Sequence, residues 1–305
     1  MQWVGRAELA SAVSNAGGLG ILTSLTQPTP QALGEEIDRC RRMTSEPFGV
    51  NLTVLPTANP PRYDDYLGVA IDRQVPVLET AGSNMATFIA RAKAAGMVVV
   101  HKCTSVRHAL SAQAHGVDAV SIDGFEAAGH AGEDDIGALV LIRIAARRLA
   151  VPVVASGGIA DGAAMAAVMA LGAEGVNMGT RFCATQEAPL HPNIKRALVS
   201  ATERDTKLIF RTLRNTGRVL RNAISEEVVA REQAPGGATF PDLHPLVAGA
   251  RGRSALERGA VDDGLVWAGQ SVGVIDDLPT CGDLIARMVA EYREAIARCQ
   301  AAALE

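Results

Sequence analysis

The 305-residue sequence is poor in aromatic residues, in net charge and in long hydrophobic runs. Only 4% of its residues are aromatic while 30 are glycine, which favours tight turns and helices packed through small side chains. The formal net charge of −4 offers no basic surface for nucleic acid or for an anionic membrane. No run of 18 or more apolar residues is present, so we expect no membrane span. The first residues also lack the basic and apolar regions of a signal peptide.

Cysteine is scarce as well, and its spacing excludes several classes of site. The thiols are scattered, without a C-x-x-C pair, at Cys40, Cys103, Cys183, Cys281 and Cys299. Zinc sites usually draw on closely spaced cysteine and histidine pairs, so we expect no metal site. Scattered thiols are typical of a reducing compartment, and we therefore expect a cytoplasmic protein.

What the sequence does contain is a repeated passage from helix to strand. Between residues 17 and 180, alanine-rich stretches end in glycine and are followed by short apolar runs, as in KAAGMVVVH and QAHGVDAVSID. Glycine tolerates the left-handed backbone that ends a helix, and a run that is apolar throughout is typical of a strand covered on both faces. The pattern predicts seven strands, near 19–22, 49–52, 75–79, 97–101, 119–123, 152–155 and 175–178. It predicts helices at 6–16, 30–43, 85–95, 105–115, 137–149 and 161–171.

Strands that alternate with helices predict an α/β fold with a parallel sheet. An open doubly wound sheet is one solution, but its G-x-G-x-x-G fingerprint after the first strand is absent. A (β/α)8 TIM barrel is therefore favoured, although it needs eight strands. Because the chain opens with a loop and a helix, we expect the first strand to have been cut off before Met1. A naturally seven-stranded barrel is the less favoured alternative.

The regular alternation stops after Thr180. Residues 191–233 are predicted to be helical, as are stretches near 241–258 and 280–303, while the proline-rich segment 54–74 is predicted to leave the barrel. We therefore expect a small helical domain that caps one face of the barrel. The predicted boundaries are 1–53, 75–190 and 290–305 for the barrel, and 54–74 and 191–289 for the cap.

Two glycine loops follow the last two predicted strands. One is Ser156-Gly157-Gly158 and the other is Gly179-Thr180. Barrels of this type commonly bind phosphate at these positions, because glycine admits a ligand close to the backbone and helix N-termini attract anions. Either loop alone is also compatible with an ordinary turn. The occurrence of both predicts a phosphate site.

Three further side chains are expected at the same mouth of the barrel. Lys102 and Asp123 end two strands, although each is also compatible with a surface or turn position. In SIDGFEAAGHAGEDD, residues 121–135, His130 follows a strand and lies between glycines. Because histidine titrates near neutral pH, it is the candidate acid or base, with an exposed loop histidine as the alternative. The nearby acids are interpreted as a solvated loop and helix-start charges (Glu126, Glu133, Asp134, Asp135).

The segments SIDGFEAAGHAGEDD, VVASGGIADG, GVNMGTRF and HKCTSVRHAL resemble those of the nitronate monooxygenase family, formerly called 2-nitropropane dioxygenases. The resemblance covers essentially the whole chain and is closest to a bacterial branch that includes NADH:quinone reductases. It implies an FMN-dependent (β/α)8 barrel with a small helical domain. Family members carry a first strand that ends in Gly-Gly just before the Met-Gln seen here.

The resemblance also implies a role for each matching residue. The FMN phosphate would be bound by Ser156, Gly157, Gly158, Gly179 and Thr180. The flavin and its ribityl chain would be lined by Met1, Gln2, Thr53, Lys102 and Asp123. His130, beside Gly129 of the G-H-x-G motif, would face the isoalloxazine ring, and Gln270 would approach the pocket.

Three functions stay open. The resemblance favours oxidation of alkyl nitronates with O2 to carbonyl compounds and nitrite, with His130 removing the α-proton of a neutral nitroalkane. An NAD(P)H:quinone reductase that uses the same FMN is the first alternative. A cofactor-free barrel that binds a phosphorylated metabolite is the second. We expect small-molecule partners, with a homodimer left open.

Overall fold

The chain folds around a parallel sheet whose strands follow one another in chain order. A computed structural model describes residues 1–54, 60–83 and 85–302. The strands are β1 (Gly20–Thr23), β2 (Phe48–Val54), β3 (Val77–Gly82), β4 (Val98–Cys103), β5 (Ala119–Asp123), β6 (Val153–Ser156) and β7 (Gly175–Asn177). All seven strands that the sequence predicts are confirmed, with small differences at their ends.

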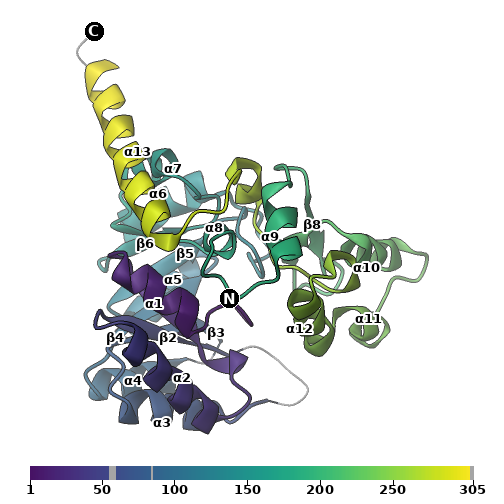
Figure 1. Cartoon of the computed structure of the whole chain (residues 1–305), viewed down its shortest axis with the longest axis horizontal. Coiled ribbons are helices and arrows are strands. Elements are labelled where there is room, and N and C mark those ends of the chain that lie inside the picture. The colour runs from purple at the N-terminus through teal and green to yellow at the C-terminus, as the bar shows by residue number, and fades with distance from the viewer. Residues whose placement is uncertain (55–59, 84, 303–305) are drawn as a thin grey trace.

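Helices cover the outer face of this sheet (Figure 1). They are α1 (Ala7–Asn15), α2 (Pro30–Met43), α3 (Tyr63–Asp72), α4 (Ala86–Ala94), α5 (Val106–Ala114), α6 (Ala138–Arg148) and α7 (Gly162–Ala170). Outward residues of the strands, such as Leu22, Leu78 and Ile122, are fully buried beneath the helices. Glycine stops end several of these helices as predicted, for example Gly96 after α4, whose φ of 78° suits glycine.

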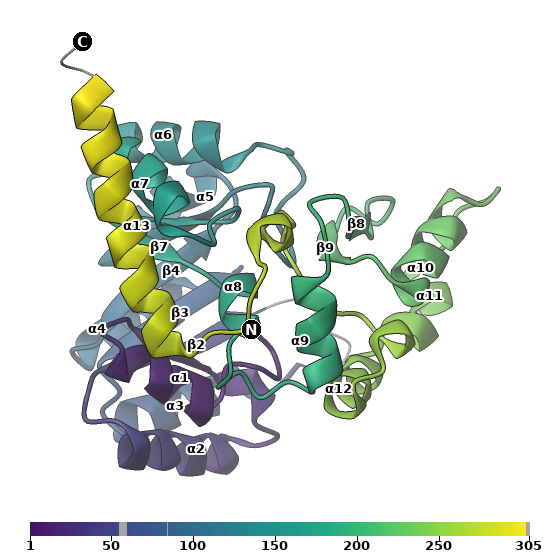
Figure 2. The ribbon, with the colours of Figure 1, turned by 45° about the horizontal axis from the view of Figure 1, so that its top comes forward.

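The sheet curls into an incomplete barrel, as Figure 2 shows from a second side. β1 and β7 form its two edges, and within the described ranges no further strand pairs with either. Helix α13 (Cys281–Ala302) packs along α7 and also contacts α1. It therefore joins the helices that flank the two edges of the sheet.

The remaining elements form a cap beside the mouth of the barrel (Figure 1). A short helix, α8 (Thr180–Cys183), follows β7, and the cap contains α9 (Pro192–Val199), α10 (Ala223–Gln233), α11 (Phe240–Val247) and α12 (Gly249–Arg258). The chain returns to the barrel through the 3-10 turns Val261–Asp263 and Gln270–Val274. Another 3-10 turn, Ser24–Thr26, follows β1. No helix among the described residues has both the length and the apolar character that a membrane span requires.

The cap is not wholly helical, which corrects one prediction. Residues 206–220 were expected in a helix but form an antiparallel hairpin of β8 (Thr206–Ile209) and β9 (Gly217–Leu220). The segment between the strands contains two residues with positive φ, Phe210 and Arg214, which a helix does not accommodate. Arg218 of β9 also pairs with Gly129 of the barrel, so the hairpin is stabilised by a contact distant in sequence.

Parts of two segments that were predicted to lie in the cap pack against the barrel. Helix α3 packs between α2 and α4, so residues 60–74 belong to the helical layer of the barrel rather than to the cap. Residues 55–59 of the same predicted segment lie outside the described part of the chain. Helix α13 packs against α7 and α1, with Ile285 close to Gly18 and Met288 close to Gly162, so it already lies against the barrel before residue 290.

The crossing of α7 and α13 provides a test of this packing. A Cβ at Gly162, the first residue of α7, would lie 2.1 Å from the carbonyl oxygen of Met288 and 2.4 Å from the amide nitrogen of Tyr292. Because both atoms belong to the backbone of α13, we expect Gly162→Ala to lower the free energy of unfolding by about 1–3 kcal/mol. Urea denaturation measures the change.

Gly68→Ala is the matched control, because Gly68 lies within α3 and, apart from the adjoining backbone of that helix, no described atom would lie within 4 Å of its added Cβ. This substitution should leave the free energy of unfolding unchanged or raise it by about 0.5–1 kcal/mol. Equal behaviour of the two variants would contradict the close docking of α13 on α7.

Candidate active site

A cavity of about 1050 Å³ lies inside the curled sheet and extends beneath the cap. All seven strands contribute to its lining, and several do so through two residues separated by one, such as Val77 and Glu79 or Val100 and Lys102. Successive side chains of a strand point to opposite faces, so residues two apart share the inner face. In β1, β3, β4 and β6 the member nearer the amino end is apolar and the one nearer the carboxyl end is polar, whereas in β2 both members, Asn51 and Thr53, are polar. The cavity therefore has an apolar base and a polar mouth.

Lys102 and Asp123 form an ion pair at the polar mouth. The Lys102 Nζ lies 3.8 Å from a carboxylate oxygen of Asp123. Burial opposes the charged ammonium, but the carboxylates of Asp123 and Glu79 outweigh burial and raise the pKa of Lys102. The other oxygen of Asp123, Oδ1, is buried and has no hydrogen-bond partner among the described residues. The pair thus offers a bound molecule one cation and one free acceptor.

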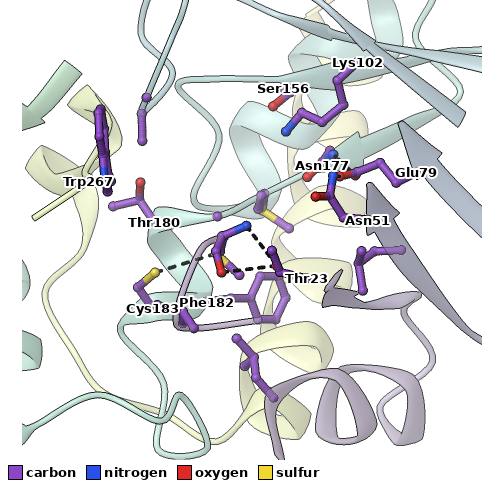
Figure 3. A pocket seen from close by; sticks show the side chains of 18 of the residues that line it. Thr23, Asn51, Glu79, Lys102, Ser156, Asn177, Thr180, Phe182, Cys183 and Trp267 are labelled. Carbon is purple, nitrogen blue, oxygen red and sulfur yellow. Dashed lines mark hydrogen bonds between the residues drawn. The ribbon is translucent and has the colours of Figure 1, made fainter. Parts of the chain in front are cut away.

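A second polar group crosses the cavity from β3 to β2 and β7. The carboxylate of Glu79 accepts hydrogen bonds from the side-chain amides of Asn51, at 2.7 Å, and Asn177, at 3.1 Å. Figure 3 shows these three side chains directed toward one another. Sequence reasoning missed this group, although a glutamate and two asparagines inside apolar strand segments were a visible signal.

The two glycine loops lie at the cavity, as the sequence predicts. Gly157 and Gly158 have φ values of 91° and 77°, in the left-handed region that favours glycine. The hydroxyl oxygen of Thr180 accepts a hydrogen bond from the buried amide of Gly269 at 3.0 Å, so its own hydrogen can be donated to a ligand.

The N-terminus of α7 is less available to a phosphate than expected from the sequence. Asp161 is the N-cap, and its side chain accepts a hydrogen bond from the amide of Ala164 at 2.7 Å. The amide of Gly162 donates to Glu291 of α13 at 2.8 Å. Two carboxylates therefore already bind the first turn of α7. An anion would therefore be bound by the backbone of Gly157 and Gly158 rather than by the first turn of α7.

His130 is held between the barrel and the cap. Its Nδ1 lies 3.2 Å from the carbonyl oxygens of both Asn215 and Thr216, and its ring centroid lies 5.7 Å from that of Trp267. A carbonyl only accepts hydrogen bonds, so Nδ1 must carry a proton in this geometry. In the neutral ring the other nitrogen, Nε2, then keeps its lone pair. His130 lines the cavity, and the arrangement suits a general base.

Two of the acids near His130 form specific interactions that were not expected of a solvated loop. Glu126 accepts from the amide of Ala138 at the start of α6, which fits a helix-start charge. Asp135, however, forms an ion pair with Arg211 of the cap, so it is not simply solvated.

The structure brings together nearly all the site residues expected from the sequence. Those that line the cavity are Met1, Gln2, Thr53, Lys102, Asp123, Gly129, His130, Ser156, Gly157, Gly158, Gly179 and Thr180. Gln270 is the exception: its neighbours Gly269 and Ser271 line the cavity, whereas its own amide donates to the carbonyl of Glu126 at 2.9 Å. Sequence reasoning also missed Thr23, Phe182, Cys183 and Trp267, which are labelled in Figure 3.

Comparison with known proteins gives a consistent result. A family model described as nitronate monooxygenase matches residues 1–291. The chain is 31% identical to the (3aS,4S,5R,7aS)-5-hydroxy-7a-methyl-1-oxo-octahydro-1H-indene-4-carboxyl-CoA dehydrogenase of Rhodococcus jostii (strain RHA1), covering 95% of this chain and 90% of that protein. It is 28% identical to a nitronate monooxygenase of Paraburkholderia phytofirmans, covering 97% of this chain and 91% of that protein.

Two solved structures are similar over nearly the whole chain. FabK from Thermotoga maritima superimposes with a TM-score of 0.90 and 35% identity, covering 99% of this chain and 93% of that one. Nitroalkane oxidase from Streptomyces ansochromogenes superimposes with a TM-score of 0.82 and 32% identity, covering 97% and 94%.

The thiol in the cavity is expected to be unreactive. Burial raises the pKa of Cys183 to about 11, and those of Cys40, Cys103 and Cys281 to about 12. At pH 8 only about one Cys183 in a thousand would be a thiolate, which is the reactive form. We expect iodoacetamide to label the exposed Cys299 first, as measured by peptide mass spectrometry. Rapid labelling of Cys183 would contradict the raised pKa and show that its thiol is accessible.

Proposed function

The chain belongs to the nitronate monooxygenase family, and we propose that it is an FMN-dependent enzyme that oxidises alkyl nitronates. In this reaction the carbon–nitrogen bond breaks and nitrogen leaves as nitrite, and the reaction balances when one O2 supplies the carbonyl oxygens of two product molecules. The observation that carries the proposal is His130, a cavity residue whose Nδ1 is bound to two carbonyls. That arrangement leaves Nε2 as a base for the α-proton of a neutral nitroalkane.

The residues of the cavity fit FMN. The unpartnered Oδ1 of Asp123 is an acceptor for a ribityl hydroxyl, and Lys102 supplies a positive charge close by. The Gly157-Gly158 pair and the hydroxyl of Thr180 provide the backbone approach and the donor that a phosphate needs. When bound, FMN would supply the electron transfer that no side chain of the cavity can perform.

The part of the chain itself is to bind, orient and move a proton. The glycine loops and Lys102 would fix the cofactor at the mouth of the cavity. The charged phosphate would then stay away from the apolar base. His130 would accept the α-proton at Nε2 and hold it as an imidazolium, with Nδ1–H still bound to the carbonyls of the cap. A nitronate that has already lost this proton would not need the base.

The phosphate loop can be tested at Gly179. Its φ of −110° is open to any residue, and an added Cβ would meet only the flexible side chain of Met1, at 3.3 Å. Gly179→Val should therefore fold but place a side chain where the phosphate is expected. We expect the Kd for FMN, measured by fluorescence quenching, to rise by roughly tenfold or more, as for loss of one or two charged hydrogen bonds.

Gly175→Ala in β7, just before this loop, is the control, because no described neighbour would lie closer than 4.0 Å to its Cβ. Its Kd for FMN should match that of the unaltered protein. Normal FMN binding by Gly179→Val would place the phosphate elsewhere.

The role of His130 can be tested with two forms of one substrate. We expect His130→Asn to lower kcat/KM for a neutral nitroalkane by roughly 10²- to 10⁴-fold, the usual effect of removing a general base. The same variant should keep far more of its kcat/KM for the pre-formed nitronate and should still bind FMN. Equal losses on both substrates would assign His130 to substrate positioning rather than proton transfer.

A second candidate function is oxidoreduction of an acyl-CoA thioester. It is favoured by the identity to the Rhodococcus carboxyl-CoA dehydrogenase and by the apolar base of the cavity, which can receive a hydrocarbon group. A thioester carbonyl, like a nitro group, makes the adjacent C–H bond more acidic. His130 would therefore be the candidate base in this reaction as well. The NAD(P)H:quinone reductase remains a further alternative. In that reaction NADH or NADPH, rather than a nitroalkane or an acyl-CoA, would supply the electrons to FMN.

One experiment separates these candidates. FMN-loaded protein is mixed without oxygen with a nitronate, an acyl-CoA, NADH or NADPH, and the flavin absorbance is followed. Our proposal expects rapid bleaching by the nitronate. Bleaching by acyl-CoA alone, or by a nicotinamide alone, would replace it with the corresponding alternative.

A further inference from the structure

Glu133 is bonded to the cap segment that holds His130. The amide of Thr216 donates to Glu133 Oε1 at 2.7 Å, and the Thr216 hydroxyl donates to Oε2 at 2.6 Å. Both oxygens of the carboxylate are thus used by one residue. Thr216 is only 1% exposed, so the two donors of these bonds are shielded from water. Glu133 itself is exposed, as expected of an acid in a solvated loop, but both of its carboxylate oxygens are bonded to the cap.

The residue that Glu133 holds is one of the two that bind His130. The carbonyl oxygens of Asn215 and Thr216 each lie 3.2 Å from Nδ1. Glu133 lies three residues after His130 in the same loop. This loop therefore carries the imidazole and also the carboxylate that binds Thr216, one of the two residues whose carbonyls accept the Nδ1 proton. Displacing Thr216 would move a carbonyl away from Nδ1 and remove the preference for a proton there.

The surrounding contacts leave little room for another arrangement. The backbones of Gly129 and Arg218 are paired on one side of the histidine, with N–O distances of 3.0 and 2.8 Å. A Cβ at Gly217 would lie 3.0 Å from the Trp267 ring and 3.7 Å from Cε1 of His130. His130 is therefore enclosed by the bridge, the tryptophan and the Glu133–Thr216 contact.

We propose that Glu133 is a positioning residue for His130. Through Thr216 it orients the carbonyls that keep the proton on Nδ1, and so it keeps Nε2 available as the base. This inference rests on the proposed function only for its catalytic consequence. The preference for one tautomer is a property of the protein itself and can be measured without substrate.

The first experiment observes the ring directly. The full-length protein is labelled with ¹⁵N-histidine, and the His130 signals are identified among the six histidines by their loss in His130→Asn. We expect a single neutral tautomer with the proton on Nδ1. Glu133→Ala, which removes both acceptors of Thr216, should produce a mixture of tautomers. Glu133→Gln keeps one amide oxygen as an acceptor and should stay close to the unaltered protein.

The matched control lies two residues away in the same loop. Asp135→Asn breaks the ion pair with Arg211, whose two side chains are each 41% exposed, and leaves Thr216 untouched. It should not change the tautomer. If Glu133→Ala does not fold, Thr216→Val serves instead, with Thr216→Ser expected to restore the hydroxyl contact and the single tautomer.

The second experiment measures the consequence for the reaction. We expect Glu133→Ala to lower kcat/KM for a neutral nitroalkane by roughly 10- to 100-fold, with less than about threefold change for the nitronate, as for loss of a residue that orients a catalytic group. A proton on Nε2 in the unaltered protein, or a tautomer unaffected by Glu133→Ala, would overturn the proposal. Should the unaltered protein use neither substrate while the tautomer still shifts, the proposed function fails and the positioning role stands.

Discussion

The antiparallel pairing of Gly129 with Arg218 is the contact on which the site depends. It joins the loop after β5 to β9 of the cap, and the histidine next to it acquires its orientation there. Arg218 itself is buried, and its guanidinium donates to the carbonyl of Phe125 and to the hydroxyl of Thr206. Burial lowers the pKa of Arg218, and the guanidinium lies 4.6 Å from the centre of the Phe125 ring. One buried cation thus fastens the cap to the loop that carries His130.

A second set of contacts joins the returning chain to the barrel. The amide of Gly269 donates to Thr180, and the amide of Gln270 donates to the carbonyl of Glu126. These bonds link the end of the cap to the loops after β7 and β5. Residues of the proposed site from three distant parts of the chain are thereby held in one arrangement, as the proposed base and cofactor would require.

The division of the cavity into an apolar base and a polar mouth follows from the geometry of a parallel sheet. All the strands run in one direction, so their carboxyl ends meet at one side, and residues two apart share the inner face. Lys102, Asp123 and Ser156 therefore come together although they lie on three strands. The same geometry directs Glu79 toward Asn51 and Asn177, in a group that ties β3 to strands on both sides of the cavity.

Local signals were enough to predict most of the barrel. The apolar runs and the glycine stops each depend on a few neighbouring residues, so the seven strands and their alternation with helices could be predicted from the sequence. The two glycine loops, Lys102, Asp123 and His130 were predictable for a related reason, because the end of a parallel strand has a known place in such a fold. The expectation that Met1, Gln2 and Thr53 line the cavity, and all the proposed contacts with FMN, come instead from the family resemblance.

Contacts between distant segments decided the rest. Residues 206–220 became a hairpin because β9 pairs with β8 and with Gly129, a partner 89 residues away from Arg218 in the chain. Glu133 supports His130 through its bond to Thr216. Gln270 does not line the cavity, and its amide donates to Glu126. No local sequence pattern predicts either bond. By itself the sequence determined where strands begin and which polar residues end them, since backbone preference and side-chain alternation are local. Only the tertiary structure decided which nitrogen of His130 carries the proton, because that depends on carbonyl groups brought to it from the cap.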